Sequence, residues 1–269
     1  MPRSPRRRLS QRGKPFPAPA EDRQAAEQLR LARAVQEKLL PPPLARLPEL
    51  ELASGFLPAP SVGGDFYDCF HLHARSLALY IGDVPGRGLE SVLYALVVNE
   101  ILRGLPKAGS EPAELLTSLN QRLLRRRALP GKFCCLAFAL VDLEQRHLVL
   151  ANAGLPFPWL HRGDTVTAVE VSGLPVGLFE PCDYDQAALS LQPGDRLLFC
   201  TDGLLYALEA LSPENGDGKE QLQALLLEAA DQPVAVLADR VLALLRPTEG
   251  RRQPRPLADD ATFLLLRVL

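Results

Sequence analysis

The strongest constraint on the fold is a hydrophobic period that changes twice along the chain. Residues 50–57, 65–73 and 76–82 are short apolar segments bounded by Gly, Pro and Ser, which is typical of strands. From residue 88 to residue 105 the apolar positions follow helical spacing, and residues 112–127 indicate a second helix. Strand-like segments then return. Strands and helices in separate blocks predict an α+β fold with largely antiparallel sheets rather than a doubly wound one.

The second block of strands starts near residue 132. Strands are predicted at residues 133–142, 147–152, 165–171 and 196–200, followed by a helical stretch at about 221–245 and a last strand at 261–268.

Composition places the chain among ordinary globular proteins. It has 269 residues, enough for a large core, with 47% apolar and 23% charged residues. The longest uninterrupted apolar run, residues 133–141, falls well short of the roughly 18 residues that a membrane helix needs. We therefore expect no membrane span.

Charge is unevenly distributed along the chain. Six of the 30 basic residues lie within the first 14 positions, so the remainder carries 24 basic against 32 acidic side chains. A protein body that bound nucleic acid would need an excess of Lys and Arg to neutralise phosphates. The acidic body therefore argues against a nucleic-acid partner.

The N-terminal region divides into a tail and a helix. Residues 1–20 are basic and proline-rich, so we expect a disordered tail, and they lack the apolar segment of a signal peptide. Residues 21–43 predict a linker helix that ends at a run of three prolines. The helix is under three heptads long, so its stripe either packs on its own domain or forms a dimer seam. The main domain is expected at residues 44–269.

Five cysteines and four histidines show no metal-binding spacing. The cysteines are odd in number, without a CxxC pair or a His at zinc spacing, which favours a reducing cytoplasm. We interpret the cysteines as small apolar core groups and the histidines as structural.

Four segments place an aspartate at a strand end or in a glycine turn. They are VGGDFYD at 62–68, GDVPGRG at 82–88, TDG at 201–203 and DDAT at 259–262. A carboxylate beside a buried strand is unfavourable unless it is hydrogen-bonded or binds a cation, so several together indicate a hard-metal site. Taken singly, TDG is more typical of a tight turn and DDAT of a solvated loop. Two metals about 3.5–4 Å apart can activate a water for phosphoryl transfer, and oxygen ligands select Mg²⁺ or Mn²⁺.

These four motifs in order, with ANAG at 151–154 between the second and third, resemble the SpoIIE/RsbU-type branch of the PPM metal-dependent serine/threonine protein phosphatases. The segment ARAVQEKLLPPP before them is similar to the helix and proline linker that precede the domain in that branch. The resemblance covers nearly everything after about residue 27 and implies a PPM-like antiparallel β-sandwich flanked by helices, in α-β-β-α layers, with metals at one end.

The resemblance also implies a ligand set for two Mn²⁺ or Mg²⁺ ions. Carried over motif by motif, Asp83 bridges the two metals and Asp65 binds the second. Asp202 and Asp259 bind the first, and Val84 adds its backbone carbonyl.

Two further aspartates remain open. Asp260 adjoins Asp259, and the sequence does not decide which of the pair is the ligand. Asp68 is interpreted as a hydrogen-bonding or surface aspartate of a strand.

The chain departs from the family pattern at three places. Arg87 stands where relatives often have His or Lys; an arginine is no general acid, because its pKa exceeds about 12, but its guanidinium can hold a phosphate. Leu155 follows ANAG where His is usual, and residues 204–208 lack the polar residues common after TDG. Because no metal carboxylate is lost, we interpret the last two departures as an altered substrate surface.

The function that the resemblance implies is hydrolysis of phosphoserine or phosphothreonine in a protein. In this family the usual substrate is a phosphorylated STAS-domain anti-sigma-factor antagonist of a partner-switching pathway. Activation would come from a separate protein or from homodimerisation through the helix at 21–40. The alternatives are a catalytically impaired phosphoprotein-binding scaffold and a phosphatase acting on small molecules.

Overall fold

The computed structural model describes residues 20–42, 47–60, 62–107, 109–126, 131–211, 214, 216–246 and 257–269. The expected disordered tail lies outside these residues, except for Ala20, which begins the first helix. The third proline of the expected helix stop also lies outside them.

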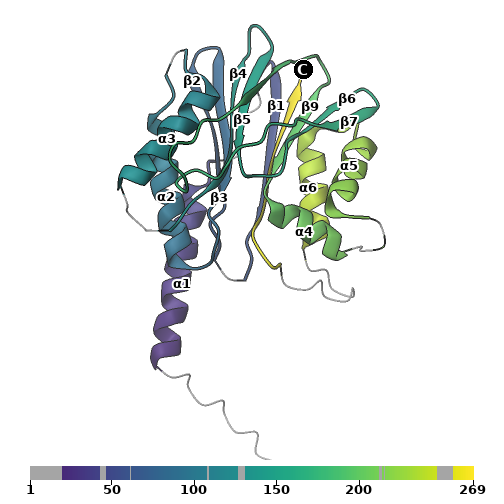
Figure 1. Cartoon of the computed structure of the whole chain (residues 1–269). Coiled ribbons are helices and arrows are strands. Elements are labelled where there is room, and N and C mark those ends of the chain that lie inside the picture. Colours follow the sequence, from purple (N-terminus) through teal and green to yellow (C-terminus); the bar gives the residue numbers. More distant parts are fainter. Residues whose placement is uncertain are drawn as a thin grey trace, which may run out of the picture.

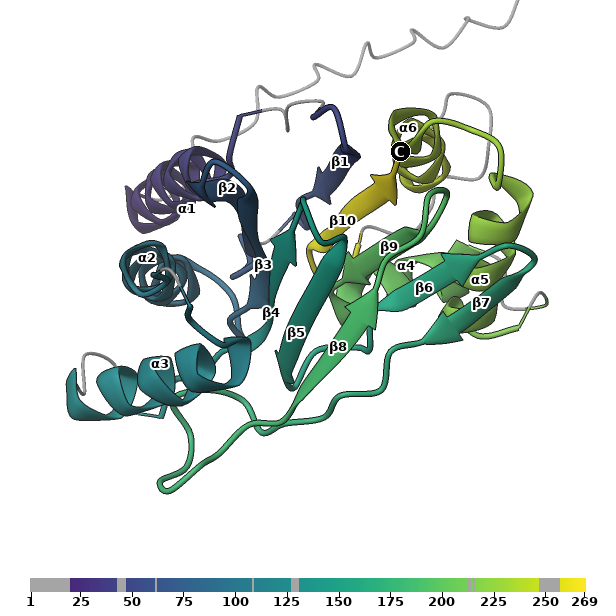
Figure 2. The ribbon, with the colours of Figure 1, turned by 90° about the horizontal axis from the view of Figure 1, so that it is seen from above.

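The strands form two antiparallel sheets packed face to face (Figures 1 and 2). The first sheet, in spatial order, contains β1 (Leu50–Leu57), β10 (Ala261–Val268), β9 (Arg196–Cys200), β6 (Trp159–Arg162) and β7 (Thr165–Ala168). The second contains β2 (Phe66–His73), β3 (Ser76–Asp83), β4 (Cys135–Asp142), β5 (His147–Ala153) and β8 (Gln186–Ser190).

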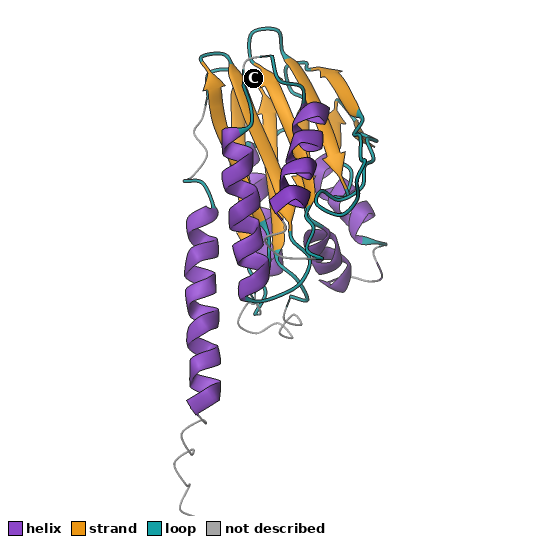
Figure 3. Ribbon diagram, turned by 60° about the vertical axis from the view of Figure 1, so that its left-hand side comes forward, coloured by secondary structure: helices purple, strands orange, loops and turns teal. Residues whose placement is uncertain are grey.

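Helices cover both outer faces, which completes four layers and confirms the predicted α-β-β-α architecture (Figure 3). The second sheet carries α1 (Ala20–Leu39), α2 (Leu89–Gly104) and α3 (Pro112–Arg126). The first carries α4 (Asp202–Leu211), α5 (Gly218–Glu228) and α6 (Val234–Leu245). The N-terminal turns of α1 extend past one end of the sandwich.

Both faces of the central strands are buried, which explains their nearly continuous apolar sequences. In β3, Leu79 and Ile81 point into the core between the sheets, whereas Ala78 and Tyr80 point toward α2 and α3. Successive strand residues point to opposite faces, so a strand covered on both sides needs apolar residues at every position.

Antiparallel pairing brings the predicted aspartate segments to one end of the sandwich. The start of β2 pairs with the end of β3 through Phe66 and Gly82. The end of β9 pairs with the start of β10 through Cys200 and Phe263. These four strand ends form the floor of the site described below.

Several predicted elements need correction. The single helical stretch at 221–245 is wrong: α5 ends at Glu228, and Pro233 is the N-cap of α6. Proline lacks the N–H that a helix interior requires, so it starts a new helix here. The sequence patterns also missed α4, β6 and β8, and they placed the start of β4 two residues early.

Helix α1 packs on its own domain over part of its length. Ala32 is fully buried, and with Val35 it contacts Val62 and Val92. Within the residues described, no helix is both long enough and apolar enough to cross a membrane.

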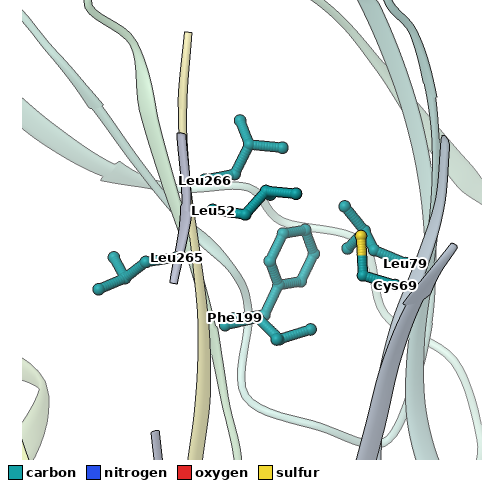
Figure 4. A pocket seen from close by; sticks show the side chains of 7 residues that line it. Leu52, Cys69, Leu79, Phe199, Leu265 and Leu266 are labelled. Atoms are coloured by element: carbon teal, nitrogen blue, oxygen red, sulfur yellow. The ribbon is translucent and has the colours of Figure 1, made fainter. Parts of the chain in front are cut away.

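A small apolar cavity lies between the sheets (Figure 4). Its lining includes Leu52, Leu79, Phe199 and the thiol of Cys69. Burial raises the pKa of Cys69 to about 12, so its thiol stays protonated at neutral pH. All five cysteines are free; Cys134 and Cys200 are buried as expected, whereas the other three are half-buried.

Candidate metal centre

Asp65 lies where the two sheets meet, immediately before β2, and only 1% of it is exposed. The hydroxyl groups of Thr201 and Thr262 both donate to its Oδ2, over 2.9 and 2.5 Å. Burial and then the charge of Asp83 raise the pKa of Asp65 well above its ordinary value. Thr201 and Thr262, at the ends of two strands of the first sheet, therefore orient the carboxylate of Asp65, which precedes a strand of the second sheet.

Asp83 is the last residue of β3 and pairs with Cys135 at the start of β4. Burial, then the charges of Asp259 and Asp202, raise the pKa of Asp83 to about 7. Charge effects of this kind act over short distances, which indicates that Asp83, Asp202 and Asp259 lie near one another.

Asp202 begins α4, directly after Thr201. Burial and then the charge of Asp259 raise its pKa, while the N–H of Gly203 lowers it. The TDG motif is therefore the start of a helix and not an isolated tight turn. A carboxylate suits this position, because the N-terminus of a helix carries partial positive charge.

Asp259 and Asp260 are neighbours in the sequence but have different surroundings in the structure. Asp260 is 1% exposed; its Oδ2 accepts from the Gln36 amide over 2.6 Å and its Oδ1 from the N–H of Ala59 over 2.8 Å. Asp259 has the larger effect on the pKa of Asp83, whereas the charge of Asp260 raises the pKa of Asp65. Asp260 anchors the surrounding segments, so the solvated-loop interpretation of this pair is wrong for Asp260, and Asp259 as the metal ligand stays a prediction.

Two glycines allow the backbone to approach the cluster closely. A Cβ atom on Gly64 would lie 2.4 Å from the carbonyl oxygen of Val84, and one on Gly203 would lie 1.9 Å from the carbonyl oxygen of Asp260. Any larger residue at either position would force the strand ends apart.

This donor set fits a hard divalent cation. Carboxylates that raise one another's pKa gain stability when a cation neutralises their repulsion, and oxygen donors suit Mg²⁺ and Mn²⁺. Among the described residues, no three His, Cys, Asp or Glu side chains already have the arrangement of an assembled metal site.

Arg87 is exposed beside the cluster. Its Nη2 donates to the carbonyl of Ala258 over 2.5 Å, next to Asp259. The guanidinium thus links the turn after β3 to the segment before β10 and leaves further N–H groups free to bind an anion.

Asp68 takes no part in the cluster. Its side chain is buried on the opposite side of β2, and its Oδ2 pairs with Nε of Arg103 over 3.0 Å. Burial raises the pKa of Asp68, while the N–H of Cys69 and then the charge of Arg103 lower it. The interpretation as a hydrogen-bonding strand residue is confirmed.

The departures after ANAG and TDG mostly lie inside the protein. Leu155 belongs to the core between the sheets, and the side chain of Asn152 bonds to both its N–H and its carbonyl. Of residues 204–208, only Tyr206 is exposed. The predicted change of substrate surface is therefore wrong for Leu155, because the turn directs its side chain into the core.

Sequence reasoning missed Gln36, Thr201 and Thr262, which hold the aspartates in place. The two threonines were visible as neighbours of the TDG and DDAT aspartates. No sequence pattern indicated Gln36, because its hydrogen-bond partner Asp260 is 224 positions away.

A sandwich of two antiparallel sheets between helices, with aspartates gathered at one end, defines a PP2C-type phosphatase fold. The SiaA-PP2C domain of Pseudomonas aeruginosa has this fold, with a TM-score of 0.74 and 23% identity over 92% of this chain and 98% of that one. The RsbU and RsbW domains of a Mycobacterium tuberculosis protein give a TM-score of 0.67 and 24% identity over 82% of this chain and 60% of that one.

The sequence profile described as "Stage II sporulation protein E (SpoIIE)" matches residues 73–269, and the chain belongs to that family. The match includes Asp83, Asp202 and Asp259 and begins after Asp65. The phosphoserine phosphatase RsbU of Bacillus subtilis is 25% identical over 247 residues, which are 89% of this chain and 70% of that protein. The phosphoserine phosphatase RsbP of the same organism is 24% identical over 90% of this chain and 58% of its own length.

Proposed function

We propose that the chain is a Mn²⁺- or Mg²⁺-dependent phosphatase that hydrolyses phosphoserine or phosphothreonine in a protein. The observation that carries this proposal is the convergence of Asp65, Asp83, Asp202 and Asp259 from four separate segments at one end of the sandwich. Two relatives of the chain are named phosphoserine phosphatases, which supports the same chemistry.

The proposed ligands follow from the resemblance of the four aspartate motifs to the family pattern. Asp83 would bridge two ions, Asp65 would hold one of them, and Asp202 with Asp259 the other, with the carbonyl of Val84 as a further donor. When bound, such ions supply an activated water and neutralise charge on the phosphoryl oxygens.

The chain's own residues orient the reacting groups. Thr201 and Thr262 direct their hydroxyls at one oxygen of Asp65 and leave its other oxygen available as a ligand. Arg87 would bind a non-bridging phosphoryl oxygen with the N–H groups that do not contact Ala258. Because a guanidinium does not release its proton, the leaving serine oxygen takes its proton from water.

The proposed substrate is a phosphorylated STAS-domain protein of a partner-switching pathway. Support comes from the relatives RsbU and RsbP, since the matches to these two phosphoserine phosphatases span 89% and 90% of this chain. A cytoplasmic location, a separate activator protein and a homodimer through α1 complete the proposal. The acidic body of the chain gives no support to a nucleic-acid substrate.

A substrate panel tests the proposal. The purified chain with Mn²⁺ is given a phosphorylated STAS protein, a phosphoserine peptide, free nucleotides and sugar phosphates, and released phosphate is measured. We expect kcat/KM to be highest for the phosphorylated STAS protein. Higher kcat/KM for nucleotides or sugar phosphates would contradict the proposal and assign the site to small molecules.

A further inference from the structure

The region before and within β4 has a charge opposite to that of the rest of the domain. Between residues 115 and 141 the sequence contains five basic residues and no acidic one, although the chain after residue 14 carries more acidic than basic side chains. Four of the five are Arg122, Arg125, Arg126 and Lys132, which the structure describes.

Three of these residues form what we call the α3 basic surface: Arg122, Arg125 and Arg126, in the last two turns of α3. All three are exposed. Within the described part of the chain none of them forms an ion pair, whereas Arg103, Arg162 and Arg240 all do. The α3 basic surface therefore presents unneutralised positive charge to solvent.

Two exposed apolar side chains lie in the segment that is bonded to α3. Leu178 is 38% and Phe179 49% exposed, in the connection from β7 to β8 that runs along α3 (Figure 2). Asn120, buried in α3, accepts from the N–H of Gly177 over 2.7 Å and donates to the carbonyl of Phe179 over 2.8 Å. These bonds fix the segment on α3, so the backbone that carries the two exposed side chains is already ordered.

The segment that carries Leu178 and Phe179 is also hydrogen-bonded to the chain beside Asp83. Val176 and Cys134 exchange two backbone hydrogen bonds, of 2.9 and 3.0 Å. The next residue, Cys135, pairs with Asp83. On the other side, Lys132 lies close enough that a Cβ atom on Gly86 would be 3.2 Å from its Nζ. The segment that carries the apolar groups is therefore bonded to the strand that pairs with Asp83, and Lys132, which pairs with Glu90 over 3.7 Å, lies beside the turn that follows Asp83.

We propose that the α3 basic surface and Phe179 form a docking site for an acidic protein surface that carries the phosphorylated side chain. The proposal rests on the proposed phosphatase function, because it assigns the site's substrate a charge. Arg and Phe are residue types enriched where proteins bind one another, and an ordered aromatic side chain loses little entropy on binding.

A protein partner fits better than a lipid surface or a nucleic acid. The apolar face of α3 is already buried through Leu115, Leu116 and Leu119, so the helix has no free apolar face to insert into a bilayer. The surface is also short, and the body around it is acidic, which opposes an extended polyanion.

The test compares kcat/KM for phosphorylated casein, an acidic phosphoprotein, with that for a phosphorylated histone and for p-nitrophenyl phosphate. The variant R122Q/R125Q/R126Q removes the charges without reversing them. The control R75Q/R146Q/R246Q removes three exposed arginines elsewhere; Arg75 and Arg146 lie in turns at the opposite end of the second sheet.

We expect the α3 variant to lose at least tenfold in kcat/KM for casein, mainly through KM, with p-nitrophenyl phosphate hydrolysis within twofold of the unmodified chain. F179A should raise KM for casein at least threefold, and the control should change neither substrate. Equal casein kinetics in the α3 variant and the control would overturn the proposal, as would an equal loss for casein and histone.

Two additional measurements separate the alternatives. Binding to phosphatidylserine vesicles or to a 20-base-pair DNA duplex that the α3 variant loses, with unchanged casein kinetics, would assign the surface to that ligand and overturn the proposal. If the unmodified chain neither binds Mn²⁺ nor hydrolyses aryl phosphate, the proposed function fails by itself. Casein binding followed by fluorescence anisotropy then tests the docking site: weaker binding by the α3 variant than by the control supports it, and equal binding overturns it.

Discussion

The side-chain amide of Gln36 donates to Oδ2 of Asp260 over 2.6 Å and also reaches the carbonyl of Gly63 at 3.2 Å. A helix that precedes the sandwich is thereby bonded to the residue next to Asp259. The hydrogen bond is buried and its acceptor is a carboxylate, so it belongs to the stronger class of such bonds.

Replacing Gln36 with Leu should destabilise the protein by about 2 kcal/mol, because the buried carboxylate of Asp260 loses a charge-assisted partner. Urea unfolding measures the change. The neighbouring exposed residue gives a matched control, Glu37→Gln, which should stay within about 0.5 kcal/mol of the unmodified chain. Equal stabilities of Gln36→Leu and the control would show that the bond contributes nothing.

Replacing Thr262 with Val keeps the shape of the side chain but removes a hydroxyl that donates to Asp65. Partners that orient a metal ligand typically contribute 10–100-fold in affinity, so Mn²⁺ should bind roughly tenfold more weakly. Titration calorimetry measures this, with Thr167→Val on the exposed side of β7 as control. Unchanged Mn²⁺ affinity in Thr262→Val would contradict this prediction, because it would show that metal binding by Asp65 does not depend on this hydrogen bond.

The metal-free protein should become less stable as pH rises. The pKa of Asp83 is about 7 in the folded state, against an ordinary value of 3.8. Its contribution is thus complete below pH 3.8 and is lost as pH passes through about 7. In EDTA the free energy of unfolding should fall across this window, on the order of 1 kcal/mol per pH unit, and Asp83→Asn should flatten the fall. An identical slope in the variant would rule out Asp83 as the source.

Replacing Asp68 with Asn should affect stability but not metal binding. The Arg103 ion pair is half exposed, so its loss should lower the free energy of unfolding by only about 1–2 kcal/mol. Mn²⁺ affinity should stay within twofold, because Asp68 lies on the other side of β2 from the cluster. A large fall in Mn²⁺ affinity would place Asp68 in the site instead.

The layers of the fold were predictable because the hydrophobic period reports burial directly. β1, β9 and β10 begin and end where the sequence places them, since each is a short, mostly apolar segment bounded by turn residues. Helix α4 was missed because Leu204 and Leu205 resume the apolar sequence of β9 after only the three residues of the TDG motif.

The charges of the predicted aspartates act on one another, so their motifs lie near each other, while their role as metal ligands stays a prediction. The residues that orient them were not accessible to motif reasoning. The donors that hold Asp260, Gln36 and Ala59, are remote from it in sequence. Leu155 shows the same limit: a motif departure indicated a surface change, whereas the backbone turn at Asn152 directs the side chain inward.

Mn²⁺-dependent hydrolysis of p-nitrophenyl phosphate, measured together with calorimetric Mn²⁺ binding in the unmodified chain, Asp83→Ala and Asp202→Ala, tests the proposed metal centre most directly. We expect activity that requires Mn²⁺, falls at least a hundredfold in both variants and is accompanied by weaker Mn²⁺ binding in each. An unmodified chain that neither binds Mn²⁺ nor hydrolyses the ester would contradict the phosphatase proposal and favour a phosphoprotein-binding scaffold with the same fold.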